Sequence, residues 1–143
     1  MKPNKASLAA ASIAALVTGC ASADSRLIGR WHSNRPLTVA SFPHRQHLSP
    51  ARRTSFDSLF GRLSLTYSRR YIHSELPVRD SDQLSRQRIP YRVLATTDDS
   101  VTIETGDNSQ RGTPTVIHFI SPNRYWMPLP GMRGREYFDR VNQ

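Results

Sequence analysis

A strict alternation of apolar and polar residues constrains the fold of this 143-residue chain more than any other feature. In the segment 61–68, GRLSLTYS, Leu63, Leu65 and Tyr67 are separated by single serine or threonine residues. Successive side chains of a β-strand point to opposite faces, so this pattern predicts a strand with one buried face. A helix would need apolar residues three or four positions apart instead.

The same two-residue period recurs on both sides of the dipeptide Asp98-Asp99, in residues 91–95 and 101–105. Aspartate is typical of tight turns because its side chain hydrogen-bonds nearby backbone groups. The two segments are therefore predicted to form a hairpin with the aspartates at its turn.

Short apolar or β-branched segments bounded by proline, glycine and asparagine predict the other strands. They cover residues 27–33, 37–42, 70–76, 115–120, 125–128 and 135–141. Segment 43–54 is either a loop or a loop that enters a short helix, with Ser49 as N-cap and Pro50 at the first helical position. The charged segment 77–88 is expected to be a loop.

These segments predict an all-β fold, an antiparallel meander of about eight short strands with at most one short helix. An open meander leaves two edge strands ready to pair with another chain. Closing the sheet into a barrel, or bending it strongly, removes those edges.

The N-terminal end has the organisation of an export signal. Two lysines without an acid precede an apolar run over residues 6–17, which is too short to span a bilayer. The run ends in Val17, Thr18, Gly19 and Cys20, an aliphatic residue, two small residues and a cysteine. This arrangement resembles the lipobox of bacterial lipoproteins.

In that family a peptidase cuts before the cysteine, whose sulfur carries a diacylglyceryl group, and the new N-terminus is acylated, typically with palmitate. Several acyl chains are what stable membrane anchoring requires. The resemblance implies a signal peptide at 1–19, a lipidated tether at 20–26 and one domain at 27–143. Ala21 after the cysteine favours the outer membrane, with the domain facing the periplasm. A cleaved signal peptide with an accidental cysteine is the alternative.

Composition limits the fold and the partners of the exported part. There is no second cysteine, so no intramolecular disulfide can hold the domain together, and its core must do so. The chain has a formal net charge of +9, and beyond the signal peptide every basic residue is arginine or histidine. This positive charge suits an acidic partner such as lipid phosphates. Alternatively, the use of arginine in place of lysine reflects the codon composition of a GC-rich genome. Nucleic acid is not expected as a partner.

The tripeptide Gly29-Arg30-Trp31 resembles the Gly-x-Trp pattern that opens the first strand of lipocalins. In that family the tryptophan closes one end of an up-and-down barrel, and an arginine of the last strand packs over its ring. The resemblance implies that Gly29 and Trp31 close a lipocalin-like barrel together with Arg140 or Arg135. It also implies an apolar cavity for a small hydrophobic ligand.

The segment 125–130, YWMPLP, is more apolar than a solvated loop. Tyr125 and Trp126 are neighbours, so they cannot both enter the core from a regular strand. We therefore expect this segment, through Tyr125, Trp126, Met127 and Leu129, to contribute a surface for a ligand or a partner.

No catalytic residue, metal or cofactor is predicted. The sequence contains no Gly-x-Ser-x-Gly elbow, phosphate-binding loop or dinucleotide fingerprint. His44 and His47 have suitable spacing for a metal, but no carboxylate or cysteine lies near them before Asp57.

Two functional classes remain. The first is a lipid-anchored protein whose barrel binds a small hydrophobic or amphipathic ligand, which requires an open mouth and an apolar interior. The second is a non-enzymatic interaction or structural module of the cell envelope, with a barrel filled by its own side chains, that docks a protein partner. The many aromatic residues fit both classes, because they can line a cavity or fill a core.

Overall fold

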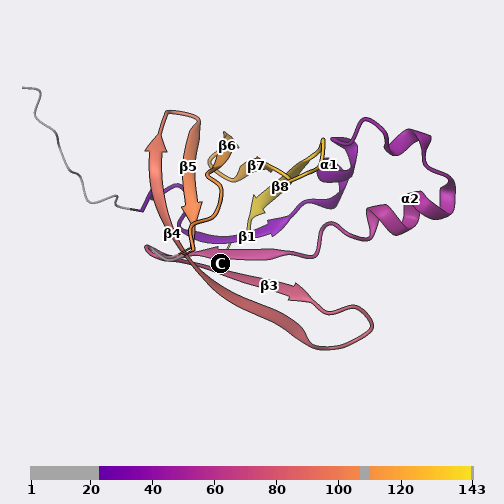
Figure 1. Cartoon of the computed structure of the whole chain (residues 1–143), viewed down its shortest axis with the longest axis horizontal. Coiled ribbons are helices and arrows are strands. Elements are labelled where there is room, and N and C mark those ends of the chain that lie inside the picture. Colours follow the sequence, from indigo (N-terminus) through magenta and orange to yellow (C-terminus); the bar gives the residue numbers. More distant parts are fainter. Residues whose placement is uncertain (1–22, 107–109, 143) are drawn as a thin grey trace, which may run out of the picture.

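The computed structural model describes residues 23–106 and 110–142, which form a barrel with a helical segment beside one end (Figure 1). The strands are β1 (Gly29–Ser33), β2 (Ser64–Tyr67), β3 (Tyr71–Pro77), β4 (Leu84–Thr96), β5 (Ser100–Thr105), β6 (Thr115–Ser121), β7 (Arg124–Pro128) and β8 (Arg135–Arg140). The helices are α1 (Arg35–Ala40), the short 3-10 helix η1 (Arg45–His47) and α2 (Pro50–Asp57). The predicted signal peptide 1–19 and Cys20 lie outside the described residues.

Each strand pairs antiparallel with the next one along the chain, and β8 pairs with β1, which closes the barrel. The predicted all-β fold of about eight antiparallel strands is therefore confirmed, and the closed barrel is the form that it takes. Within residues 23–106 and 110–142, α2 is the one helix longer than six residues. No helix in this part of the chain has the length and hydropathy of a membrane span.

The hairpin around the two aspartates is also present. β4 and β5 pair from Tyr91 opposite Thr105 to Thr96 opposite Val101, with one irregularity in register between Val93 and Ala95. Tyr91, Val93, Val101 and Ile103 are buried as the alternation predicts, because a strand on a barrel has one face on the core. Ala95, which the alternation also pointed inward, follows the irregularity in register and is exposed.

The prediction of a strand over residues 37–42 is wrong, because most of these residues form α1. The side chain of Asn34 caps this helix by accepting a hydrogen bond from the backbone N–H of Leu37 at 3.0 Å. The hydroxyl of Thr38 accepts a hydrogen bond from the N–H of Tyr137 in β8 at 3.0 Å. The helix thus supplies a hydrogen-bond partner to the backbone of β8 where β1 no longer pairs with that strand.

The loop predicted over residues 77–88 is shorter than expected, since β4 begins at Leu84. β3 and β4 stay paired from Tyr71 opposite Pro90 as far as Pro77 opposite Leu84, and this hairpin projects beyond its neighbours (Figure 1). Residues 84–88 are exposed on both faces, so no hydrophobic alternation marks them as a strand.

Of the two alternatives for segment 43–54, the structure has the one with a helix, since Pro50 begins α2 and the hydroxyl of Ser49 accepts a hydrogen bond from the N–H of Arg52. After the helix, Phe60 is buried, and its ring lies 5.3 Å from the rings of both Phe42 and Phe56. This aromatic cluster holds the helical segment together against the barrel.

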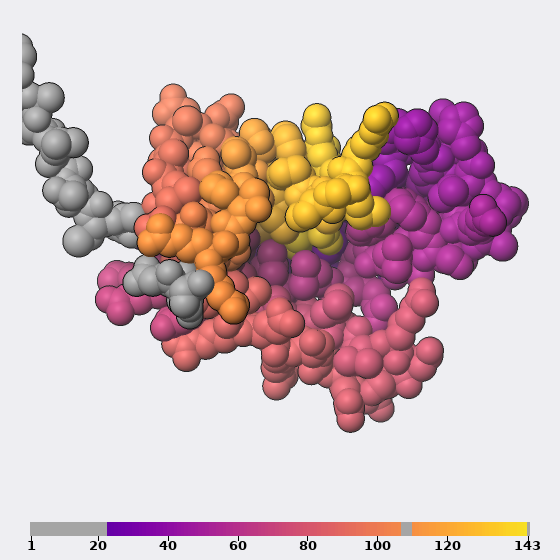
Figure 2. All heavy atoms as spheres, viewed as in Figure 1, coloured from indigo at the N-terminus to yellow at the C-terminus, as the bar shows by residue number. Residues whose placement is uncertain are grey.

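The two ends of the barrel differ. The end that carries the β2–β3, β4–β5 and β6–β7 turns is called the floor below. The opposite end, called the mouth, carries the β3–β4, β5–β6 and β7–β8 connections and the helical segment that joins β1 to β2. In Figures 1 and 2 the helices and the β3–β4 hairpin lie on the right, away from the β2–β3 turn and the start of the described chain. The largest fully buried side chains belong to Trp31, Tyr125 and Phe138.

Candidate ligand-binding cavity

The floor is closed by Trp31 and Arg140. The guanidinium carbon of Arg140 lies 4.2 Å from the centre of the Trp31 ring, and Nη1 and Nη2 donate to the carbonyls of Ile28 and Arg26 at 2.8 and 2.6 Å. Gly29 has a φ of +127°, and a Cβ there would lie 2.8 Å from Nη1 of Arg140. Glycine is therefore needed for both the backbone conformation and the space.

A second arginine closes the same end. The guanidinium carbon of Arg26 lies 5.0 Å from the centre of the Phe119 ring, and its Nη1 donates to the carbonyl of Asp98 at 2.8 Å. Nη2 contacts the carboxylate of Asp24 at 2.8 Å, and this hydrogen bond lowers the pKa of Asp24. Sequence reasoning placed both residues in the tether at 20–26, whereas they belong to the folded domain.

Arg135 does not reach Trp31. Its guanidinium lies 4.2 Å from the centre of the Trp126 ring, on the outer wall of the barrel, where His118 stacks on the same ring at 4.0 Å. Of the two arginines that the resemblance left open, Arg140 occupies the position over Trp31. Tyr125 is fully buried, so it is Trp126 that faces outward.

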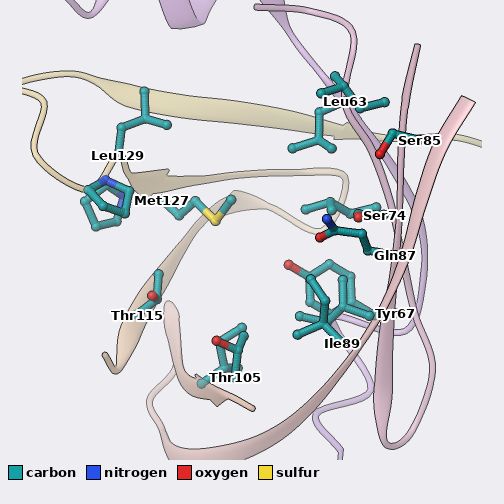
Figure 3. A pocket seen from close by; sticks show the side chains of 16 residues that line it. Leu63, Tyr67, Ser74, Ser85, Gln87, Ile89, Thr105, Thr115, Met127 and Leu129 are labelled. Atoms are coloured by element: carbon teal, nitrogen blue, oxygen red, sulfur yellow. The ribbon is translucent and has the colours of Figure 1, made fainter. Parts of the chain in front are cut away.

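Above the aromatic layer, a cavity of about 390 Å³ extends toward the mouth (Figure 3). Apolar side chains from five strands and from the segment before β2 supply most of its wall: Leu63, Leu65, Ile72, Ile89, Ile103 and Met127. Five further lining residues are polar and uncharged: Ser74, Ser85, Gln87, Thr105 and Thr115. Among the described residues that line the cavity, none carries a charge. Such a site accepts an apolar body and a few neutral hydrogen-bonding groups.

Two of the four residues predicted in segment 125–130 reach this cavity. Met127 and Leu129 line it, and Figure 3 shows both on the wall opposite Ser85. Tyr125 lies deeper, outside the cavity lining, and Trp126 is on the outer wall. The sequence identified the segment, but the alternation of the strand divides it between the two faces.

The inner part of the cavity has a polar feature that the sequence did not indicate. The hydroxyl of Tyr67, a lining residue, lies 3.3 Å from the hydroxyl of Tyr125. Burial raises the pKa of both phenols, so they stay protonated at neutral pH and either can donate a hydrogen bond.

One buried carboxylate lies inside the barrel. Glu136 is opposite Met127 in the sheet register and is 7% exposed, and its carboxylate accepts a hydrogen bond from the hydroxyl of Ser33 at 2.7 Å. Ser33 in turn accepts a hydrogen bond from the N–H of Gly61 at 3.1 Å. Desolvation raises the pKa of Glu136, and the bond from Ser33 opposes this shift only in part. No sequence pattern marked this residue.

The histidine pair of the η1 region has no third possible metal ligand gathered with it among the described residues. The rings of His44 and His47 are 6.2 Å apart between centroids. Within residues 23–106 and 110–142, no three histidine, cysteine, aspartate or glutamate side chains gather in a way that could hold a metal ion.

Comparisons of the chain with protein-family models, with curated proteins and with solved structures find no match. The function is therefore inferred from the cavity and from the closed floor of the barrel.

We expect Arg140→Lys to lower the free energy of unfolding by about 1–3 kcal/mol, because an ammonium cannot stack flat on Trp31 and serve several carbonyls at once. Chemical denaturation measures this loss. The control is Arg124→Lys at the same end, where the ion pair with Asp139 is exposed and screened by solvent, so its loss should have little effect. Equal effects of the two substitutions would contradict the role given to Arg140.

We expect Glu136→Gln to change how stability depends on pH. A carboxyl whose pKa is raised by folding binds more protons in the native state, so stability falls as pH rises from the unfolded pKa, near 4.5, through the raised value. Glutamine keeps an oxygen for Ser33 but does not titrate, so the variant should be more stable than the parent at pH 7.5 and should lack that fall. Urea denaturation between pH 4 and pH 8 tests this, with Glu75→Gln as the solvent-accessible control. A parallel pH profile for parent and Glu136→Gln would refute it.

Proposed function

We propose that this chain is a lipid-anchored protein of the bacterial cell envelope whose lipocalin-like barrel binds a small hydrophobic or amphipathic ligand. The observation that carries the proposal is the cavity of about 390 Å³ at the mouth, whose wall is apolar and uncharged. A barrel whose interior is filled along its whole length would have no such space.

The size and chemistry of the cavity limit the ligand. Its volume is near the lower end of the range for small-molecule sites, so it suits one compact molecule or one alkyl chain. A charged group inside would lose its hydration without an opposite charge to replace it, which is costly. A charged head group would therefore stay at the mouth, and neutral polar groups would meet Ser74, Gln87 or Tyr67.

Binding is proposed in preference to catalysis. The hydroxyls of Ser74 and Ser85 could in principle serve as nucleophiles. The described part of the cavity wall, however, holds no histidine, carboxylate or amine that could activate them. The lining residues instead offer hydrophobic contact and neutral hydrogen bonds.

The lipid anchor is proposed on the lipobox-like residues that end at Cys20. The folded domain begins almost directly after that cysteine, with Asp24 and Arg26 already bound to the floor. Ala21 supports the outer membrane as the destination, with the barrel on the periplasmic side.

One observation supports the alternative, an interaction module that docks a protein partner. Trp126 lies on the outer wall between β6 and β8, where His118 and Arg135 flank its ring and leave it partly exposed. Tryptophan and arginine are common at protein–protein contacts. The open cavity nevertheless favours ligand binding, because a pure docking module has no need of it.

We expect Ser74→Phe to weaken binding of a fluorescent hydrophobic probe such as an anilinonaphthalene at least tenfold, because the ring would occupy the cavity. His73→Phe is the matched control, since His73 is the preceding residue of β3, exposed on the outer face. Titrations followed by fluorescence, and native mass spectrometry of the protein purified without detergent, measure binding. Full binding by the Ser74→Phe variant would exclude this cavity as the site.

We expect Cys20→Ser to move the protein from the membrane fraction to the soluble fraction, because serine cannot accept the thioether-linked lipid. Fractionation of cells that export the full chain, with metabolic labelling by an alkyne fatty acid, reads out the change. A variant that stays in the membrane fraction would overturn the lipid anchor.

A further inference from the structure

The floor is the end of the barrel at which the N-terminal segment enters the fold. The carboxylate of Asp24 is bound to Arg26. The backbone carbonyl of Asp24 accepts a hydrogen bond from the N–H of Leu27 at 3.0 Å. Arg26 is itself fastened to the β4–β5 turn through the carbonyl of Asp98. Cys20 precedes Asp24 by four residues, and a fully extended chain of that length reaches at most about 14 Å.

The floor exposes apolar side chains around one guanidinium. Ile28 is 36% exposed, Ile120 is 56% exposed and Val141 is 39% exposed. The carbonyls of Ile28 and Pro122 both accept hydrogen bonds from Arg140, and Val141 follows Arg140 in sequence. Ile120 also lines a shallow hollow with Arg26. Isolated exposed aliphatic residues are ordinary, but these three leave apolar area in contact with water at the end of the barrel where the chain enters.

The charges at this end are mixed. Arg69 and Arg70 are exposed in the β2–β3 turn, and Asp98 and Asp99 are exposed in the β4–β5 turn. This distribution is compatible with a largely zwitterionic phospholipid surface that contains some anionic lipid, because the arginines can meet phosphate groups. It does not require a strongly anionic membrane.

We infer that the floor is the face on which the barrel rests against the phospholipid surface that holds its anchor, so that the cavity opens away from that membrane. The inference rests on the proposed lipidation of Cys20. The partner is the bilayer itself, since the short connection between Cys20 and Asp24 keeps the floor next to it whatever else the barrel contacts.

The barrel's own dimensions keep the mouth away from the anchor. At the tilt of about 35–45° that barrel strands have, the seven residues of β3 rise about 16–19 Å along the barrel axis from floor to mouth. That exceeds the reach of the tether, so the mouth cannot take the place of the floor at the point of attachment. Ligand therefore enters and leaves on the aqueous side, where Leu76, Val78 and Leu84 are exposed at the β3–β4 hairpin.

The test uses the absence of any second cysteine in the chain. Lipidation consumes the sulfur of Cys20, so a cysteine introduced elsewhere is the one free thiol of the anchored protein. Ile120→Cys at the floor and Leu84→Cys at the mouth are matched sites, both exposed aliphatic residues at strand ends. Each full-length lipidated variant is labelled with a polarity-sensitive fluorophore and reconstituted into phosphatidylethanolamine–phosphatidylglycerol vesicles that contain a head-group spin-labelled lipid.

We expect the label at position 120 to show blue-shifted emission and at least fivefold stronger quenching by the spin-labelled lipid than the label at position 84. Adding Ile28→Ser and Val141→Ser to the floor variant should reduce that quenching at least twofold. Stronger quenching at position 84, equal quenching at both, or none at either would overturn the orientation.

Two further readings separate this inference from the proposed function. Protein that washes off the vesicles overturns lipid anchoring, and the orientation with it. Probe binding in the same samples reports on the cavity alone, so its loss would count against ligand binding while the quenching pattern still decides the orientation.

Discussion

The contact between Arg140 and Trp31 is the interaction on which the rest of the structure depends. It joins the last strand to the first at the point where the barrel must close, and the guanidinium also binds the carbonyls of Arg26, Ile28 and Pro122. A planar group with several fixed donors can stack on a ring and serve those carbonyls at the same time. One side chain therefore seals the sheet and ties the N-terminal segment and the β6–β7 turn to the floor.

The closed floor makes the open mouth possible. Trp31, Tyr125 and Phe138 fill the lower part of the interior, whereas smaller aliphatic and hydroxyl side chains line the upper part and leave a cavity. An eight-stranded barrel is only just wide enough for its own side chains, so the space depends on where the large residues lie. Because the largest side chains lie at the floor, the mouth keeps space for a ligand.

The remaining edge of the sheet is satisfied by a helix in place of a strand. β1 leaves β8 after Ser33, and α1 and its C-cap residue then supply hydroxyl groups to the freed backbone of β8. Thr38 accepts a hydrogen bond from the N–H of Tyr137, and Ser41 accepts one from the N–H of Arg135. An unsatisfied edge would invite pairing with another chain. The position of the segment beside β8 thus outweighs the local β preference of Thr38 and Val39.

The sequence by itself determined the all-β class and the hairpin around Asp98-Asp99, because alternation and turn residues are local properties that adjacent residues express. It left the helix capped by Ser49 as one of two alternatives for segment 43–54. It also narrowed the partner of Trp31 to Arg140 or Arg135. Only the tertiary structure decided between them, recruited Arg26 to the floor, buried Glu136 and left the cavity open at one end. Those outcomes depend on the register and closure of eight strands, which bring together residues more than a hundred positions apart, and no local pattern contains that information.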